Sequence, residues 1–176
     1  MATVTRIFEF DAAHRVMNEK VKCFNLHGHR FKVEATFSYD TKGKLGYAID
    51  FKEIKRLCGE FIDEFLDHAC ILNPLDEDLI GVCKKNNWRM WIMGLGNGGD
   101  INPSAENIAS ELWLCFRHFL WKTEHGVELV SLRLYETPNC WVDTQGYDYH
   151  ESRGFHEWLQ EWRLAKGNVC YDVREE

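Results

Sequence analysis

Blocks of lysine or arginine are missing from this sequence of 176 residues, which carries a formal net charge of −7 at pH 7. Proteins that bind nucleic acid neutralise phosphates with a basic face, so the sequence argues against a nucleic-acid partner. The N-terminus has no basic segment followed by an apolar run, and no apolar run approaches the roughly 20 residues that span a membrane. We therefore expect a cytoplasmic protein with no membrane partner.

A cysteine framework is also missing. The seven cysteines have no compact spacing, so most are expected to be free thiols in a reducing compartment. No internal repeat of fixed period occurs. The length and the 45% hydrophobic content predict a single domain over residues 1–176.

Hydrophobic patterning predicts an α+β fold. Alternation of apolar and polar residues indicates strands, and apolar residues at helical spacing indicate two helices. Asp50 is expected to cap the first helix. Asn102-Pro103 is expected to open the second, with the proline at the first helical position. Residues 74–101 are rich in charge and glycine and are expected to be a loop. A short amphipathic helix is expected near 154–165. The predicted strands, which with the helices give the order ββααββ, are 3–13, 29–39, 127–136 and 140–149.

The stretch "KCFNLHGHRF" (22–31) places His27 and His29 two residues apart, so that both side chains of an extended strand point to one face. His14, on the preceding predicted strand, can add a third imidazole. Three neutral imidazoles with an open fourth position are typical of catalytic zinc, whereas Cys23 as a fourth ligand would close a structural site. The spacing leaves both arrangements open, as well as histidines that bind no metal.

Two acidic positions suggest further chemistry. Asp67 and His68 are adjacent at the end of the first predicted helix, where the carboxylate can hold one imidazole nitrogen and make a general acid or base of the other. The alternative is a histidine that only interacts with the helix dipole. Glu136 ends an apolar strand and can accept two parallel N–H donors from a guanine-like ring edge. The alternative is an exposed glutamate at a strand end.

Six motifs together resemble the 6-pyruvoyltetrahydropterin synthase / 6-carboxytetrahydropterin synthase family over residues 6 to about 140. They occur in the family's order and are "FDAAHR" (10–15), "CFNLHGH" (23–29), "YAIDF" (47–51), "LDH" (66–68), "NPSAEN" (102–107) and "YET" (135–137).

The resemblance implies the tunnelling fold, in which a four-stranded antiparallel sheet is backed by two helices. Such units join their sheets into a β-barrel of three subunits, and two trimers commonly stack as a homohexamer. Active sites then lie between subunits. Compared with short family members, the chain has an insertion at about 74–101 and a C-terminal extension from about 148.

Residue roles carried over from the family fall on eight positions. His14, His27 and His29 would bind Zn²⁺. Cys23 would be a catalytic thiolate beside the metal, and Asp67 with His68 the proton relay. Glu136 would anchor the pterin ring, with Ser104 near it. Lys20, Lys22, Arg15 and Arg30 are candidates for contact with a triphosphate.

The implied substrate is 7,8-dihydroneopterin triphosphate. Three residues separate Cys23 from His27, the short interval of 6-carboxy-5,6,7,8-tetrahydropterin synthases, which release acetaldehyde and triphosphate on the 7-deazaguanine route to queuosine. The expected enzyme is therefore a carbon-carbon lyase. The runner-up is 6-pyruvoyltetrahydropterin synthase, a phosphorus-oxygen lyase.

The same fold also hosts pterin epimerases, aldolases and GTP cyclohydrolase I, which bind the ring edge through a glutamate in the same way. The combination of Cys23, Asp67 and His68 argues against these activities. A zinc-stapled oligomer that binds a pterin or purine without catalysis is the non-enzymatic hypothesis.

Overall fold

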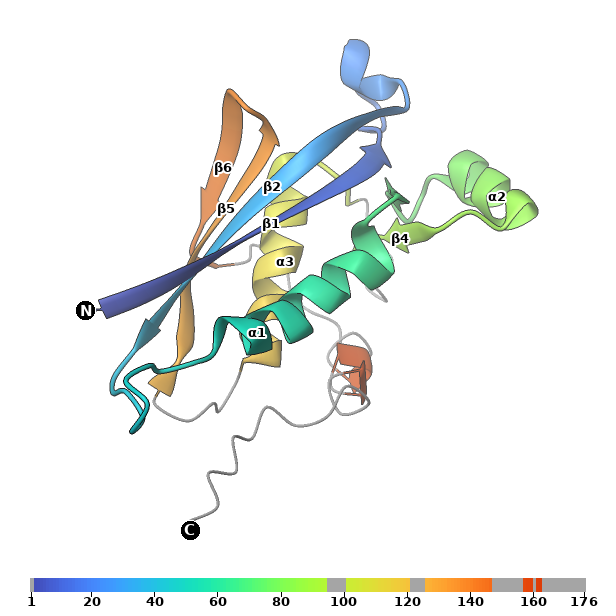
Figure 1. The fold of residues 1–176 in the computed structure, drawn as a ribbon. Helices are drawn as coiled ribbons and strands as arrows, with labels where there is room; N and C mark the ends of the chain where they lie inside the picture. Colours follow the sequence, from blue (N-terminus) through green and yellow to red (C-terminus); the bar gives the residue numbers. More distant parts are fainter. Residues whose placement is uncertain (1, 95–100, 121–125, 147–156, 160, 163–176) are drawn as a thin grey trace.

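The structure is a computed structural model that describes residues 2–94, 101–120, 126–146, 157–159 and 161–162. It has the predicted α+β architecture, in which a curled sheet is backed on one face by two long helices (Figure 1). Within the described residues, no helix is both long and apolar enough to cross a bilayer.

The sheet has six strands in the order β4-β3-β1-β2-β5-β6. Antiparallel pairing joins β1 to β2, as the sequence predicted, and β2 to β5 and β5 to β6, as the family resemblance implied. The two additional strands are short and parallel: β3 pairs with β1 only over Ala12–His14, and β4 pairs with β3. The expected count of four was therefore wrong, because β3 and β4 extend the sheet at the end of β1. The strands are β1 (Ala2–His14), β2 (His27–Tyr39), β3 (Ala69–Leu72), β4 (Met90–Ile92), β5 (Glu128–Thr137) and β6 (Cys140–Thr144).

The first long helix begins where the sequence predicted. Asp50 caps it, since its carboxylate accepts a hydrogen bond from the Lys52 backbone N–H at 2.8 Å. α1 (Phe51–Ile54) continues through two π-helical segments, η2 (Lys55–Gly59) and η3 (Ile62–Leu66). The helix ends at Leu66, so Asp67 and His68 lie just beyond it.

The second long helix, α3 (Ala105–Phe119), begins two residues later than predicted. Ser104 is its N-cap, with the hydroxyl accepting from the Asn107 N–H at 3.4 Å, and Pro103 therefore lies outside the helix. The serine hydroxyl provides the cap that proline cannot, which explains the later start.

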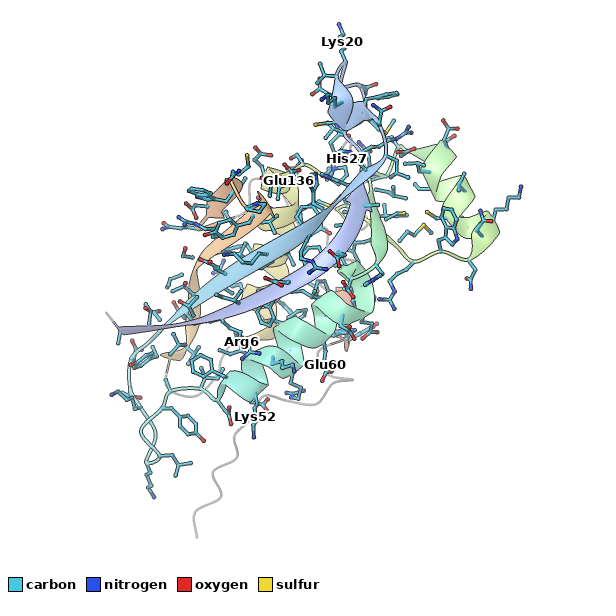
Figure 2. The ribbon with its side chains drawn as sticks, turned by 45° about the horizontal axis from the view of Figure 1, so that its top comes forward. Arg6, Lys20, His27, Lys52, Glu60 and Glu136 are labelled. Carbon is cyan, nitrogen blue, oxygen red and sulfur yellow. The ribbon has the colours of Figure 1, made fainter. Side chains whose placement is uncertain are left out.

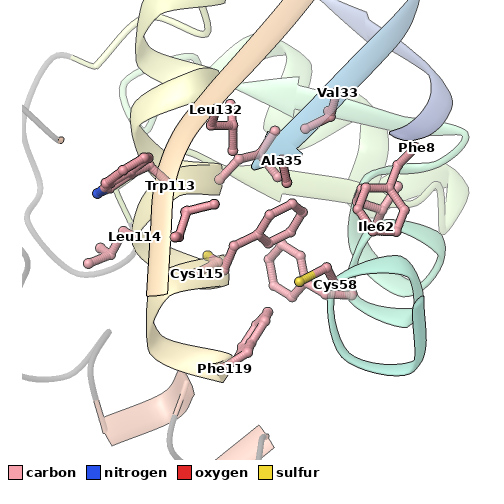
Figure 3. Close-up of a cluster of buried hydrophobic side chains, with 14 of the residues drawn as sticks. Phe8, Val33, Ala35, Cys58, Ile62, Trp113, Leu114, Cys115, Phe119 and Leu132 are labelled. Carbon is pink, nitrogen blue, oxygen red and sulfur yellow. The ribbon is translucent and has the colours of Figure 1, made fainter. Parts of the chain in front are cut away.

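The core lies between the sheet and the two helices (Figure 3). Even-numbered residues of β1 and odd-numbered residues of β2 face the helices, and these positions include Phe8, Phe10, Phe31 and Val33, all buried. We call this the inner face of the sheet and the opposite one the outer face. The alternation continues to the ends of both strands and therefore decides where the functional side chains point.

The prediction of a loop over 74–101 was wrong for most of its described part. It contains α2 (Glu77–Asn86) and β4, while residues 95–100 lie outside the described residues. α2 buries only Cys83, so it lacks the apolar stripe on which a helix prediction depends. Its signals are polar instead: Asp76 at the N-cap, acidic residues in the first turn and lysines in the last.

The C-terminal prediction is confirmed in part. Residues 157–159 and 161–162 are helical, and the rest of 154–165 lies outside the described residues, as do 147–149 of the fourth predicted strand. Leu159 and Trp162 are buried, and the Trp158 ring packs 5.7 Å from that of Trp91. The predicted insertion and extension thus contact each other against the core.

Candidate functional site

Three histidines meet at one end of the inner face. His14 of β1 is directly opposite His27 of β2, and His29 follows two residues later on the same face. Their ring centroids are 4.6 Å (His14–His27), 5.2 Å (His14–His29) and 5.0 Å (His27–His29) apart. One ring nitrogen from each lies within 4.8 Å of the others, and this group could hold a metal ion. The predicted convergence is confirmed.

Backbone carbonyls fix the orientation of two of these rings. His14 Nδ1 lies 2.6 Å from the Pro103 carbonyl oxygen, and His27 Nδ1 lies 2.7 Å from that of Asn25. Because a carbonyl only accepts, both Nδ1 atoms carry the proton and both Nε2 lone pairs are free to bind a metal. His14 is 1% exposed, and within the described part of the chain its Nε2 has no hydrogen-bond partner. A buried nitrogen of this kind is costly unless something binds it.

The electrostatic surroundings favour neutral imidazole at His14. Burial lowers its pKa, a hydrogen bond to the Pro103 carbonyl opposes this, and His27 lowers the pKa further. A metal ligand must be the unprotonated base, so burial keeps His14 in the form that binds.

Glu136 lies beside the histidines. It occupies an inner-face position near the end of β5, and its Oε1 is 3.5 Å from His14 Nε2 and 3.8 Å from His29 Nε2. Figure 2 shows Glu136 and His27 at the same end of the sheet. Its side chain is 30% exposed. The structure therefore places Glu136 at the site rather than in open solvent, while contact with a pterin ring stays a prediction.

Cys23 lies in the short 3₁₀ helix η1 (Lys22–Phe24), in the loop between β1 and β2. Its side chain is exposed, and its carbonyl accepts from the Val16 N–H at 2.8 Å across the loop. The sulfur is not part of the metal-binding group formed by His14, His27 and His29. The histidines thus converge without it, and whether it acts as a thiolate stays a prediction.

Asp67 and His68 form the predicted pair. His68 Nδ1 lies 2.7 Å from Asp67 Oδ2, and Asp67 Oδ1 accepts from the Asp11 N–H at 3.0 Å. His68 has a left-handed backbone with φ of 57°, which turns the chain sharply after the helix and lets neighbouring residues face each other. The imidazole is 77% exposed, so its Nε2 is available for proton transfer.

The Asp67–His68 pair lies beside outer-face residues of β1 and β2. His68 shares a surface depression with His29 and with Asp11 and Arg30, the last two of which pair directly across β1 and β2 at outer-face positions. Arg30 donates to both Asp11 carboxylate oxygens at 3.0 and 2.9 Å and lowers the pKa of that carboxyl. Within one chain, therefore, the relay lies next to Asp11 and Arg30, which point to the opposite face of the sheet from His14, His27 and His29.

Several of the remaining predicted residues have roles in the scaffold. Ser104 caps α3 next to Pro103, the residue that orients His14, and substrate contact by Ser104 stays a prediction. Of the basic candidates, Arg15 and Arg30 are held by Asp76 and Asp11, respectively. Lys20 and Lys22 are exposed in the loop that carries Cys23, and Figure 2 shows Lys20 there.

Sequence reasoning missed the role of Asn102. Its side-chain oxygen accepts from the Met17 N–H at 2.7 Å and from Asn73 Nδ2 at 3.1 Å, and its amide donates to the Met17 carbonyl at 3.2 Å. It thereby joins the chain just after His14 to the segment before α3. The only sequence signal was the motif "NPSAEN", which does not reveal such a contact.

Comparison with known proteins shows the family of the chain. The family model described as 6-pyruvoyl tetrahydropterin synthase matches residues 3–147. A 6-carboxy-5,6,7,8-tetrahydropterin synthase of Rickettsia conorii is 40% identical over 143 residues, covering 81% of this chain and 99% of that protein, and one of Haemophilus influenzae is 28% identical over 151 residues, covering 82% and 99%. The structure of Caenorhabditis elegans 6-pyruvoyl tetrahydropterin synthase shares the fold, with a TM-score of 0.58 at 21% identity over 82% of this chain and 95% of that one. This chain belongs to the 6-pyruvoyl tetrahydropterin synthase family.

Proposed function

We propose that this protein is a zinc-dependent lyase that converts 7,8-dihydroneopterin triphosphate and water to 6-carboxy-5,6,7,8-tetrahydropterin, acetaldehyde and triphosphate. The observation that carries the proposal is the inner-face group of His14, His27 and His29, with a buried unsatisfied nitrogen and Glu136 beside it. The activity for which the relatives are named, with matches over four-fifths of the chain, supports the same reaction class.

Zinc fits the donor set. Three imidazole nitrogens, two of them oriented by backbone carbonyls, are ligands that suit Zn²⁺ and leave a coordination position for substrate. When bound, zinc supplies a Lewis acid that polarises substrate oxygens and stabilises negative charge developing on them.

The protein's own residues supply binding and proton transfer. Glu136 accepts N–H donors from the pterin edge and so orients the ring. Cys23, exposed four residues before His27, removes a proton from the substrate side chain as the thiolate. His68, held at Nδ1 by Asp67, donates or accepts a proton at Nε2.

The open edges of the sheet support the proposed assembly. Among the described strands, β3 pairs with β1 only over Ala12–His14, so most of the edge of β1 opposite β2 has no strand partner. At the far end of the sheet, β6 is the edge strand. We infer the tunnelling-fold arrangement, in which neighbouring chains join these edges into a barrel of three subunits and two trimers form a hexamer. Closure removes the free edges.

The same assembly explains the outer-face position of the relay. Asp67 and His68 lie beside the outer-face residues Asp11 and Arg30 and would serve the site of a neighbouring chain.

The short interval from Cys23 to His27 and the names of the relatives favour the carboxy-forming reaction, a step of 7-deazaguanine biosynthesis in the cytoplasm. The second candidate, the pyruvoyl-forming reaction, is favoured by the description of the matching family model. It loses triphosphate without cleaving the side chain.

Product analysis tests the proposal. Zinc-loaded protein is incubated with 7,8-dihydroneopterin triphosphate, and the products are identified by mass. Acetaldehyde with a carboxylated pterin supports the proposed lyase, a pyruvoyl pterin supports the second candidate, and tight binding without turnover would leave only a binding module. Cys23→Ala should lose turnover by orders of magnitude, whereas Cys140→Ala, which changes the other exposed cysteine of the described residues, should not.

A further inference from the structure

The loop between β1 and β2 is fastened at its first residues. Val16 donates to the Cys23 carbonyl at 2.8 Å, which closes the loop on itself. Both the N–H and the carbonyl of Met17 bond to the Asn102 side chain. The loop that carries Cys23 therefore has defined attachments to the scaffold, and Arg15, at its start, makes another.

Arg15 forms a two-pronged ion pair with the N-cap of α2. Its Nε and Nη2 donate to the two carboxylate oxygens of Asp76, each at 2.6 Å. The Asp76 side chain is 1% exposed and that of Arg15 is 18% exposed, so the pair is largely shielded from water. Asp76 also accepts from the Leu79 N–H at 3.1 Å and thereby begins the helix. Two parallel hydrogen bonds of this kind fix the orientation of the guanidinium as well as its distance from the carboxylate.

Arg15 also contacts the residue that follows the cysteine. Its guanidinium carbon lies 5.4 Å from the centre of the Phe24 ring, within the range of a cation–π contact. Arg15 thus touches α2 on one side and η1 on the other. Phe24 is 46% exposed.

We propose that α2 acts, through Asp76 and Arg15, as the support that positions the loop carrying Cys23. Arg15 and Asp76 are positioning residues in this proposal, and Arg15 does not bind a substrate triphosphate because its fork is taken by Asp76. The segment predicted as an insertion thereby acquires a role at the site. The catalytic consequence rests on the proposed function, whereas the ordering of the loop does not.

Asp76→Asn tests the support directly. Asparagine caps a helix as well as aspartate does, so α2 should persist while the charge-assisted fork is lost. Hydrogen exchange in peptides covering residues 16–24 should accelerate about tenfold or more, since such a bond is among the stronger ones in a protein. Exchange in β2 residues 31–37 should not change. With zinc content unchanged, kcat should fall about 10- to 100-fold with little change in KM, because misplacing a reacting group slows chemistry more than binding.

Two further variants make the result decisive. Glu77→Gln, on the first turn of α2 and outside the Arg15 fork, is the matched control and should leave both loop exchange and kcat unchanged. Arg15→Lys keeps the charge but cannot form the fork, so it should loosen the loop even if Asp76→Asn disturbs α2. Loop exchange as slow as wild type in both Asp76→Asn and Arg15→Lys would overturn the proposal. Absence of wild-type turnover would instead refute the proposed function, and loop exchange would still decide the support.

Discussion

Zinc should stabilise the folded protein through the three histidines and without Cys23. In the metal-free protein, His14 Nε2 is a buried nitrogen without a hydrogen-bond partner in the described structure, which costs about 1–3 kcal/mol. Removal of this cost is part of the free energy of zinc binding, which at a free concentration 100 times its Kd stabilises the folded protein by about 2.7 kcal/mol in total. For a chain of this size, at roughly 2–4 °C per kcal/mol, the midpoint of thermal unfolding should rise by about 5–11 °C.

The assay is a thermal melt of chelator-treated protein at increasing free zinc, paired with metal analysis. His27→Ala should abolish the shift, and because His27 is only partly buried the metal-free variant should fold normally. Cys23→Ala and His68→Ala should keep the full shift, since neither residue belongs to the metal-binding group. A shift that disappears in Cys23→Ala would make the sulfur a ligand and refute the assignment of three imidazoles. Wild-type protein that folds but does not respond to zinc would refute the metal site itself.

Two further substitutions test whether Glu136 binds the pterin and whether Ser104 stabilises the fold. Glu136→Gln should weaken binding of a dihydropterin by about tenfold in calorimetry, because the amide places a donor against the ring's donors, whereas Glu128→Gln, at the other end of β5, should not. Equal affinity of the two variants would remove Glu136 from the pocket. Ser104→Ala should lower the free energy of unfolding by about 1 kcal/mol in urea titrations through loss of the α3 cap, and Ser104→Thr should retain most of it. Full stability of Ser104→Ala would contradict the capping role.

The histidine group could be predicted because it depends on local periodicity. His27 and His29 share a face in any extended strand, and antiparallel pairing of two adjacent strands brings His14 opposite His27. The same alternation places Glu136 on the inner face of β5. Strand residues of the site thus follow from the pattern that defines the core.

The parts of the fold and of the site that the sequence did not predict depend on features without a periodic signal. α2 is mostly exposed, so its helix is specified by charges and caps rather than by an apolar stripe. The direction of His68 depends on one left-handed residue after the helix, and short parallel strands such as β3 need distant partners to form. The Arg15–Asp76 pair joins residues 61 positions apart, a contact that a single sequence does not encode locally.

The outer-face position of His68 leads to a test of subunit sharing. If each site combines Cys23 of one chain with His68 of another, Cys23→Ala and His68→Ala chains are each inactive alone but complement each other when they assemble together. Random mixing in equal amounts should restore about a quarter of wild-type activity, because a site in a symmetric oligomer is intact when both of its contributing chains supply the unmutated residue. Mixing the proteins after separate assembly, without subunit exchange, is the control and should restore none. If both residues instead served the site of their own chain, no co-assembled mixture would regain activity, and the outer-face position of the relay would then need a conformational change within one subunit.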